Sequence, residues 1–167
     1  VKEAGGIPFL TDCNTLYPGS RKNAIEHMYC AWENGFTPMT VGCPVIIGDG
    51  LKGTDDIAVP VKGGTYIKEA KIGRAIMDAD IFISLTHFKG HESTGFGGAI
   101  KNIGMGCGSR AGKKDQHSNG KPTIDPEVCR GCKRCMRECA NQGLEFDETT
   151  KKMQVNAENC LGCGRCL

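Results

Sequence analysis

The segment EVCRGCKRC at residues 127–135 returns 31 residues later as ENCLGCGRC at residues 158–166. Both copies space their cysteines as C-x2-C-x2-C, and Cys139 extends the first copy to C-x2-C-x2-C-x3-C. Short apolar runs lie between the copies and predict a small hairpin that turns at residues 148–151. The C-terminal part of the chain is therefore one repeated unit built around cysteines.

Cysteines at this spacing are typical of iron–sulfur proteins, because successive thiolates reach three corners of a cuboidal cluster from one loop. Gly131 and Gly162 let each loop turn tightly and aim backbone N–H groups at the cluster sulfurs. In two-cluster ferredoxins the fourth cysteine of each run ligates the other cluster. We therefore predict two [4Fe–4S] clusters. One is held by Cys139, Cys160, Cys163 and Cys166; the other is held by Cys129, Cys132 and Cys135, with its fourth ligand expected just after residue 167.

Two other interpretations of the cysteines are weaker. A zinc ribbon uses four cysteines in two pairs, whereas this segment has two runs of three plus Cys139. A disulfide scaffold would spread its cysteines over the chain, but seven of the 11 crowd into residues 129–166 and their number is odd. Metal ligation in a reducing compartment fits better, so we expect a cytoplasmic protein.

Composition excludes some classes of partner. The 167 residues carry a formal net charge of +2, which does not favour nucleic acid or a membrane surface. No run of 18 apolar residues predicts a membrane span, and no secretory signal is visible.

Before the cysteines, apolar runs alternate with helical patterns, which predicts an α/β domain over residues 1–120. We expect an open, mostly parallel sheet, followed by a small α+β ferredoxin-like module over residues 121–167. The expected strands are residues 7–11, 45–48, 57–61 and 81–85; the expected helices are 20–34, 66–79 and, as a short one, 97–105.

Polar side chains follow three of these strands. In open α/β sheets, ligands bind beyond the carboxyl ends of the strands, so these side chains are expected to line one pocket. Ordinary turn-rich loops are the alternative. The residues are Asp12 and Asn14, then Asp49 and Lys52, then His87, Lys89 and His91.

A glycine-rich stretch at residues 95–102 lacks the third glycine of a dinucleotide fingerprint and is not a phosphate-binding Walker loop. It can still bind an anion, with Lys101 nearby and further cations over residues 110–114. His117 adds a group that titrates near neutral pH. These residues indicate an anionic ligand; a solvated basic loop is the alternative.

Two further residues carry open alternatives. His87 and His91 are spaced to bind a metal from one helix face, although Gly90 disfavours a helix, and acid–base or hydrogen-bonding roles are favoured over a metal. Cys107 can be a nucleophile, a substitute cluster ligand or a packed small residue, and packing is favoured.

Three segments together resemble the iron–sulfur proteins of the family called domain of unknown function 362. They are FLTDCNTLYPG at residues 9–19, IIGDGLKG at 46–53 and THFKGHESTGFGGAIKNIGMGCGSRAGKKDQHS at 86–118, followed by the cysteines. The resemblance implies an α/β domain with an inserted or appended two-cluster module. Members of this family are longer at both ends, so we expect this chain to be an internal portion. The family supplies no reaction.

These patterns favour an iron–sulfur electron-transfer protein, as a redox enzyme or the redox half of one, whose partner is a redox protein or a small-molecule substrate. The alternative is a non-catalytic electron carrier or a cluster-bearing subunit. The expected proton donors are His87, His91 and His117. The expected ligands of an anionic substrate are Asp12, Asn14, Asp49, Lys52, Lys89 and Lys101.

Overall fold

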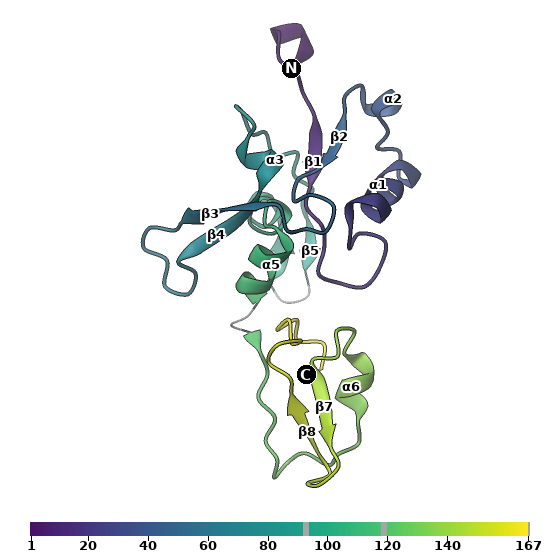
Figure 1. Ribbon diagram of the computed structural model, residues 1–167, viewed down its shortest axis with the longest axis vertical. Coiled ribbons are helices and arrows are strands. Elements are labelled where there is room, and N and C mark those ends of the chain that lie inside the picture. Colours follow the sequence, from purple (N-terminus) through teal and green to yellow (C-terminus); the bar gives the residue numbers. More distant parts are fainter. Residues whose placement is uncertain (92–93, 118–119, 167) are drawn as a thin grey trace. The chain divides into compact units, whose positions relative to one another are not determined.

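The computed structural model describes residues 1–91, 94–117 and 120–166. The chain divides into two units, residues 1–113 and 114–167, which we call unit 1 and unit 2. Helices and strands occur in both, so the fold is mixed α/β, as the sequence predicts. Figure 1 shows the elements in chain order.

Unit 1 begins with a short 3-10 turn, η1 (Lys2–Ala4), and a strand–helix–strand segment. Strand β1 (Leu10–Asp12) pairs in parallel with β2 (Val45–Ile47), and the helices α1 (Ala24–Glu33) and α2 (Pro38–Val41) connect them (Figure 1). Both strands lie within or beside the predicted ranges. The carboxyl ends of two parallel strands meet at the same edge.

Helix α1 starts later than the sequence suggests. The predicted range begins at residue 20, but the side chain of Asn23 accepts the Glu26 N–H at 3.0 Å and caps the helix there. Asparagine in extended backbone geometry is among the best residues for this position. The helix ends at Glu33, with Asn34 as its C-cap and Gly35 next, at a φ of 87°, as the glycine predicts.

The predicted helix over residues 66–79 is wrong in its first half. Strand β4 (Glu69–Gly73) occupies it and pairs antiparallel with β3 (Asp56–Pro60); only α3 (Arg74–Met77) is helical. The spacing of Ala70 and Ile72 also suits a strand, and pairing with the preceding strand overrides the weak helical preference of so short a segment.

The strand predicted over residues 81–85 is also wrong: the structure has no strand there, and Ile81, Ile83 and Leu85 are exposed. A strand needs a neighbour with free backbone groups. The next elements are β5 (Lys89–His91) and β6 (Gly95–Gly97), which pair antiparallel with each other.

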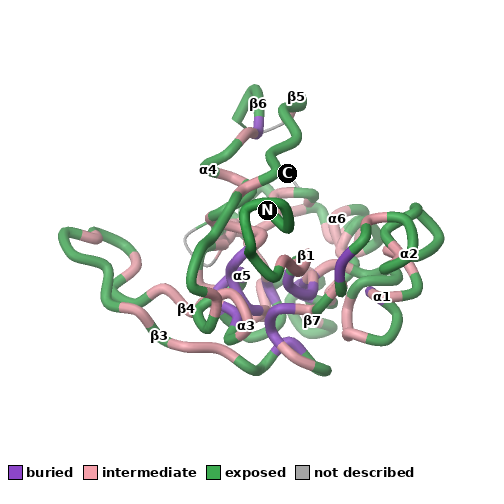
Figure 2. Tube along the Cα trace, turned by 90° about the horizontal axis from the view of Figure 1, so that it is seen from above, coloured by how far each residue is buried: buried purple, intermediate pink, exposed green. Residues whose placement is uncertain are grey.

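The described strands thus form four two-stranded sheets, of which only β1–β2 is parallel. The open, mostly parallel sheet stays a prediction. Exposed residues dominate the β5–β6 hairpin and the end of the β3–β4 hairpin, drawn green in Figure 2.

The short helix expected over residues 97–105 is present as α4 (Ala99–Lys101), which continues into the π-helical turn η2 (Asn102–Gly106). Helix α5 (Arg110–His117) follows and contains the boundary between the units. Among the described residues, no helix combines the length and the apolar composition needed to cross a membrane.

Unit 2 contains helix α6 (Arg134–Glu138) and the antiparallel strands β7 (Leu144–Asp147) and β8 (Lys152–Val155). The predicted hairpin is therefore present, and its turn lies at residues 148–151. The Asp147 carboxylate stabilises this turn by accepting the N–H of Thr149 at 2.8 Å and the hydroxyl of Thr150 at 2.9 Å.

Gly73 should tolerate no side chain. A Cβ there would lie 2.7 Å from the Cys13 sulfur and 2.8 Å from the Gly48 carbonyl oxygen. We expect Gly73→Ala to lower the free energy of unfolding of unit 1 by about 1–3 kcal/mol because of this overpacking. Urea unfolding followed by the fluorescence of Trp32, the single tryptophan, measures it.

Gly90→Ala is the matched control, because a Cβ at Gly90 meets no atom within 4 Å. It should change the unfolding free energy by no more than about 0.5 kcal/mol. Equal stability of the two variants would contradict the close contact at Gly73.

Candidate functional site

The two cysteine copies have the same backbone structure. The Cys129 N–H donates to the Asp125 carbonyl at 2.9 Å, and the Cys160 N–H donates to the Asn156 carbonyl at the same distance. The side chains of Asp125 and Asn156 each also accept the N–H two residues further on, at 2.8 and 3.0 Å. The sequence repeat is therefore a structural repeat, with one turn leading into each run of cysteines.

Glycine is required at the same place in both loops. Gly131 has a φ of 64° and Gly162 a φ of 66°, in the left-handed region that disfavours other residues. A Cβ at Gly131 would lie 2.2 Å from the Lys151 carbonyl oxygen, and one at Gly162 would lie 2.1 Å from that of His117. Both loops thus turn tightly at their glycines, as the sequence predicts, and both also pack against neighbouring backbone.

Backbone N–H groups point at cysteine sulfurs. The Met153 N–H donates to the Cys129 sulfur at 3.4 Å, and the Gly143 N–H donates to the Cys139 sulfur at 3.1 Å. Hydrogen bonds from the N–H groups of Met153 and Gly131 lower the pKa of the Cys129 thiol. They favour the thiolate, which is the form that binds metals.

Four thiols of unit 2 share one electrostatic neighbourhood. Burial raises the pKa of Cys166, and the thiols of Cys163, Cys139 and Cys160 raise it further. Cys139 belongs to the first run of cysteines and the other three belong to the second. These are the four cysteines that the ferredoxin ligation rule assigns to one cluster, and the interaction between their charges is the feature that links them.

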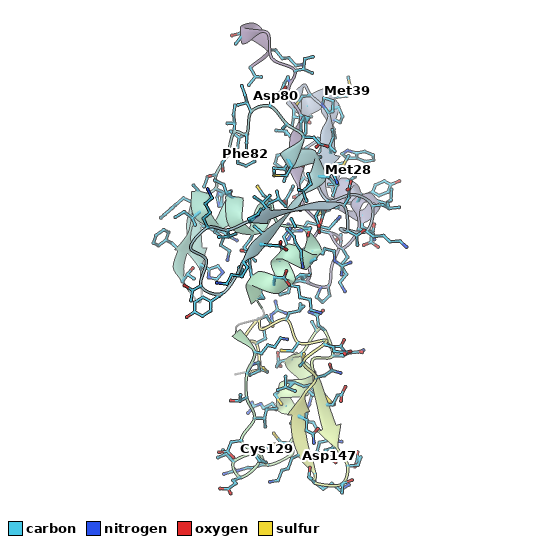
Figure 3. The ribbon with its side chains drawn as sticks, turned by 60° about the vertical axis from the view of Figure 1, so that its left-hand side comes forward. Met28, Met39, Asp80, Phe82, Cys129 and Asp147 are labelled. Carbon is cyan, nitrogen blue, oxygen red and sulfur yellow. The ribbon has the colours of Figure 1, made fainter. Side chains whose placement is uncertain are left out.

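A cavity of about 340 Å³ lies beside the first run of cysteines. Cys129, Cys132 and Cys135 line it, and Cys166 also borders it. Its remaining wall consists of Pro122, Thr123, Ile124, Asp125, Val128, Arg130, Gly131, Leu144 and Met153. Cys129 lies at the end of unit 2 that carries the β7–β8 turn (Figure 3), and the Lys152 ammonium donates to its carbonyl at 2.6 Å.

In unit 1 the ends of the two parallel strands meet, as the sequence predicts. The Asp49 Oδ1 accepts the Asn14 backbone N–H at 2.9 Å and the Asn14 side-chain amide at 2.8 Å. The same amide donates to the Gly50 carbonyl at 2.9 Å. Both side chains are fully buried, so in this structure they join the strand ends and do not face solvent.

Lys113 completes this cluster. Its buried ammonium donates to the Cys13 carbonyl at 3.2 Å and to the Gly108 carbonyl at 2.8 Å. Burial lowers the pKa of Lys113, whereas nearby Cys13, Asp12 and Asp49 raise it. Burial also raises the pKa of Asp49. The hydrogen bond from the Asn14 N–H and the charge of Lys113 lower this pKa but do not cancel the effect of burial.

Unit 1 has three buried thiols, and two of them, Cys13 and Cys107, have raised pKa values. Burial, followed by the charge of Asp49, raises the pKa of Cys13 to about 12. Burial also raises the pKa of Cys107, whose carbonyl accepts the Cys13 thiol at 3.5 Å. Neither is a ready nucleophile at neutral pH, and a packed small residue is the interpretation of Cys107 that fits.

His27 is a buried polar residue that the sequence reasoning missed. Its Nε2 lies 3.8 Å from the Asp12 carboxylate, and burial lowers its pKa while Asp12 raises it. The signal was its position three residues after Ala24 and four before Ala31, which places a histidine on the inner face of α1.

The other candidate residues lie apart from this cluster. Lys52, His87 and Lys89 are exposed, and His91 and Lys101 are partly exposed. His91 is in β5, not in a helix, and its Nδ1 accepts the Thr94 N–H at 3.3 Å. Within the described ranges, none of these five side chains hydrogen-bonds to Asn14 or Asp49. His117 belongs to unit 2.

The buried carboxyl of Asp49 should make the stability of unit 1 depend on pH. A raised pKa means that the folded state holds the proton more tightly than the unfolded state. Stability should therefore fall as pH rises from the ordinary carboxyl value of about 4 through the raised pKa of Asp49. Urea unfolding of wild type and Asp49→Asn at several pH values, followed by Trp32 fluorescence, measures it.

In Asp49→Asn this fall should be lost, whereas Asp80→Asn, at an exposed position, should keep it. Parallel pH profiles for wild type and Asp49→Asn would show that Asp49 ionises normally in the folded protein.

Comparison with known proteins gives one match. The family model described as Domain of unknown function (DUF362) matches residues 1–160, which is nearly the whole chain. No curated protein and no solved structure matches. The chain belongs to the DUF362 family.

Proposed function

We propose that unit 2 binds two [4Fe–4S] clusters and that the protein transfers electrons one at a time. The observation that carries this is the structural repeat: two equal turns, 31 residues apart, each bend around a left-handed glycine between cysteines in the C-x2-C-x2-C spacing. This spacing and the N–H groups aimed at the sulfurs are features of cluster-binding loops.

The arrangement of the donors suits a cluster better than a single zinc ion. Zinc holds each thiolate at about 2.3 Å, so its ligands must converge on one point. Among the described residues, no three His, Cys, Asp or Glu side chains converge closely enough to hold one ion. A cuboidal cluster instead takes thiolates at separate corners, which agrees with cysteines spread around a cavity and along two loops.

The proposed ligands follow the crossed pattern. One cluster is assigned to Cys139, Cys160, Cys163 and Cys166, whose thiols interact. The other is assigned to Cys129, Cys132 and Cys135. The clusters would supply one-electron redox chemistry, and the N–H groups of Gly143 and Met153 would tune their potentials by stabilising charge on the sulfurs.

In the leading form of the proposal, unit 1 is the substrate-binding part of a redox enzyme. Lys52, Lys89 and Lys101 would bind an anionic substrate, because their ammonium groups reach solvent. His87 and His91 would donate the protons that a two-electron reduction needs. Asp12, Asn14 and Asp49 would position the loops after β1 and β2.

The second candidate is an electron carrier or a cluster-bearing subunit without a substrate. The full burial of Asn14 and Asp49 favours it, because buried residues that bind each other can serve stability alone. The two forms differ in whether unit 1 binds a small anion.

Cysteine variants of the complete protein, prepared without oxygen, test the clusters and their ligands. Cys163→Ser and Cys139→Ser should each remove about half of the iron and acid-labile sulfide, because both cysteines serve one cluster. The double variant of these two should still keep about half, whereas Cys132→Ser combined with Cys163→Ser should lose nearly all of it.

Cys30→Ser, in helix α1 of unit 1, is the control and should keep the full iron content. Wild-type protein without sulfide would refute the proposed function. Near-complete loss in the Cys139–Cys163 double variant would refute the crossed assignment alone.

A thermal-shift screen separates the enzyme from the carrier. Inorganic phosphate and small dicarboxylates at millimolar concentration should raise the melting temperature of unit 1 by several degrees if it binds anions. The shift should disappear in Lys101→Gln and persist in Lys62→Gln, whose exposed lysine lies in the β3–β4 turn. No shift with any anion would favour the carrier.

A further inference from the structure

The two halves of the cysteine repeat carry different charges. Arg130 and Lys133 stand where the second copy has Leu161 and Gly164. Over the nine repeated positions, the first copy has three cations and one anion, whereas the second has one of each. The backbone turns match, so the difference does not arise from the fold of the loops.

Lys133 adopts a backbone conformation that favours its glycine counterpart. Its φ is 59°, and Gly164 has a φ of 77° in the second copy. A lysine in the left-handed region is less stable than glycine there, because its Cβ comes too close to the backbone. A non-glycine residue in this conformation persists only where other interactions hold it. Such residues are common at functional sites.

The side chain of Lys133 is held in place at the hairpin. Its ammonium lies 3.7 Å from the centroid of the Phe146 ring and 3.7 Å from the Glu148 carboxylate. Glu148 also pairs with Lys151 at 2.8 Å. Lys133 is therefore a positioned cation.

Further cations lie beside the same cysteines. Arg130 lines the cavity together with Cys132, and both are exposed. Arg134 and Arg137 are exposed and three residues apart, so they share one face of helix α6. We call Arg130, Lys133, Arg134 and Arg137 the basic rim.

We infer that the basic rim docks an acidic electron-transfer protein at the first cluster site. The inference rests on the proposed function, since it names the partner of that site. Opposite charges around a redox centre speed encounter and orient the partner. To dock here, an acidic protein needs only the positive charge of the basic rim, whatever the net charge of the whole chain. A cluster held by Cys129, Cys132 and Cys135 would accept one electron from the reduced partner, and no bond would break or proton move.

The probe is an acidic flavodoxin in its hydroquinone state, which supplies the electron, and the acceptor is the complete cluster-loaded protein. Stopped-flow absorbance gives the second-order rate constant as a function of ionic strength. The test variant is Arg130→Leu with Lys133→Gly, which gives the first loop the residues of the second. The control is Lys62→Gln with Lys68→Gln, which removes equal charge from the β3–β4 turn of unit 1.

At low salt the test variant should react with flavodoxin about tenfold more slowly than wild type, and its rate should fall less steeply with salt. The control variant should match wild type. Reduction by the methyl viologen radical cation, which a basic rim does not attract, should not slow by a similar factor in the test variant. An altered reduction potential alone would not change how the rate constant depends on ionic strength.

The inference is overturned if the test variant keeps the rate and salt dependence of wild type with flavodoxin. It is also overturned if that rate is unchanged while the variant loses affinity for single-stranded DNA, which would make the rim a nucleic-acid site. Iron and sulfide counting in each variant separates the two proposals. Intact clusters with an unchanged flavodoxin rate refute the docking surface alone, whereas absent clusters in wild type refute the proposed function as well.

Discussion

On the proposed function, the stability of unit 2 depends on how its seven cysteine thiols are held, because the unit buries few apolar side chains. Its buried apolar side chains, within the described residues, are Leu144, Met153 and Cys160. A unit this small buries little surface and usually needs a covalent or metal bridge. All of its cysteines are free, so no disulfide supplies that bridge. Thiolates at close range repel one another. On the proposed function, iron would neutralise this repulsion, and its bonds to the thiolates would be the main stabilising interaction of the unit.

Unit 1 is organised differently, around buried polar groups and not around metal ligands. The Asn14–Asp49 hydrogen bonds tie the end of β1 to the end of β2, and Lys113 binds the backbone of the same corner from helix α5. Buried polar groups are costly unless they are paired, so such a cluster stabilises only one arrangement of its loops. Of the candidate anion-binding lysines, Lys52 lies in the turn that directly follows Asp49.

The sequence predicted the features that depend on local spacing. The repeat, the hairpin of unit 2 and the meeting of Asn14 with Asp49 follow from cysteine spacing, alternation and the geometry of parallel strands. Prediction from the sequence failed where contacts between residues far apart in the chain determine the secondary structure or the burial of a side chain. Residues 69–73 form a strand because β3 lies beside them, and residues 81–85 form none. The burial of Asp49 depends on Lys113, 64 positions away, and the role of His27 on Asp12, so neither could be predicted from local pattern.

The central claim is that the thiols of unit 2 hold iron and sulfide. Low-temperature electron paramagnetic resonance of the complete protein, purified without oxygen and reduced with dithionite, tests it most directly. We expect signals from two interacting [4Fe–4S] clusters that integrate to about two spins per chain. A reduced protein that gives no such signal and contains stoichiometric zinc without acid-labile sulfide would contradict it.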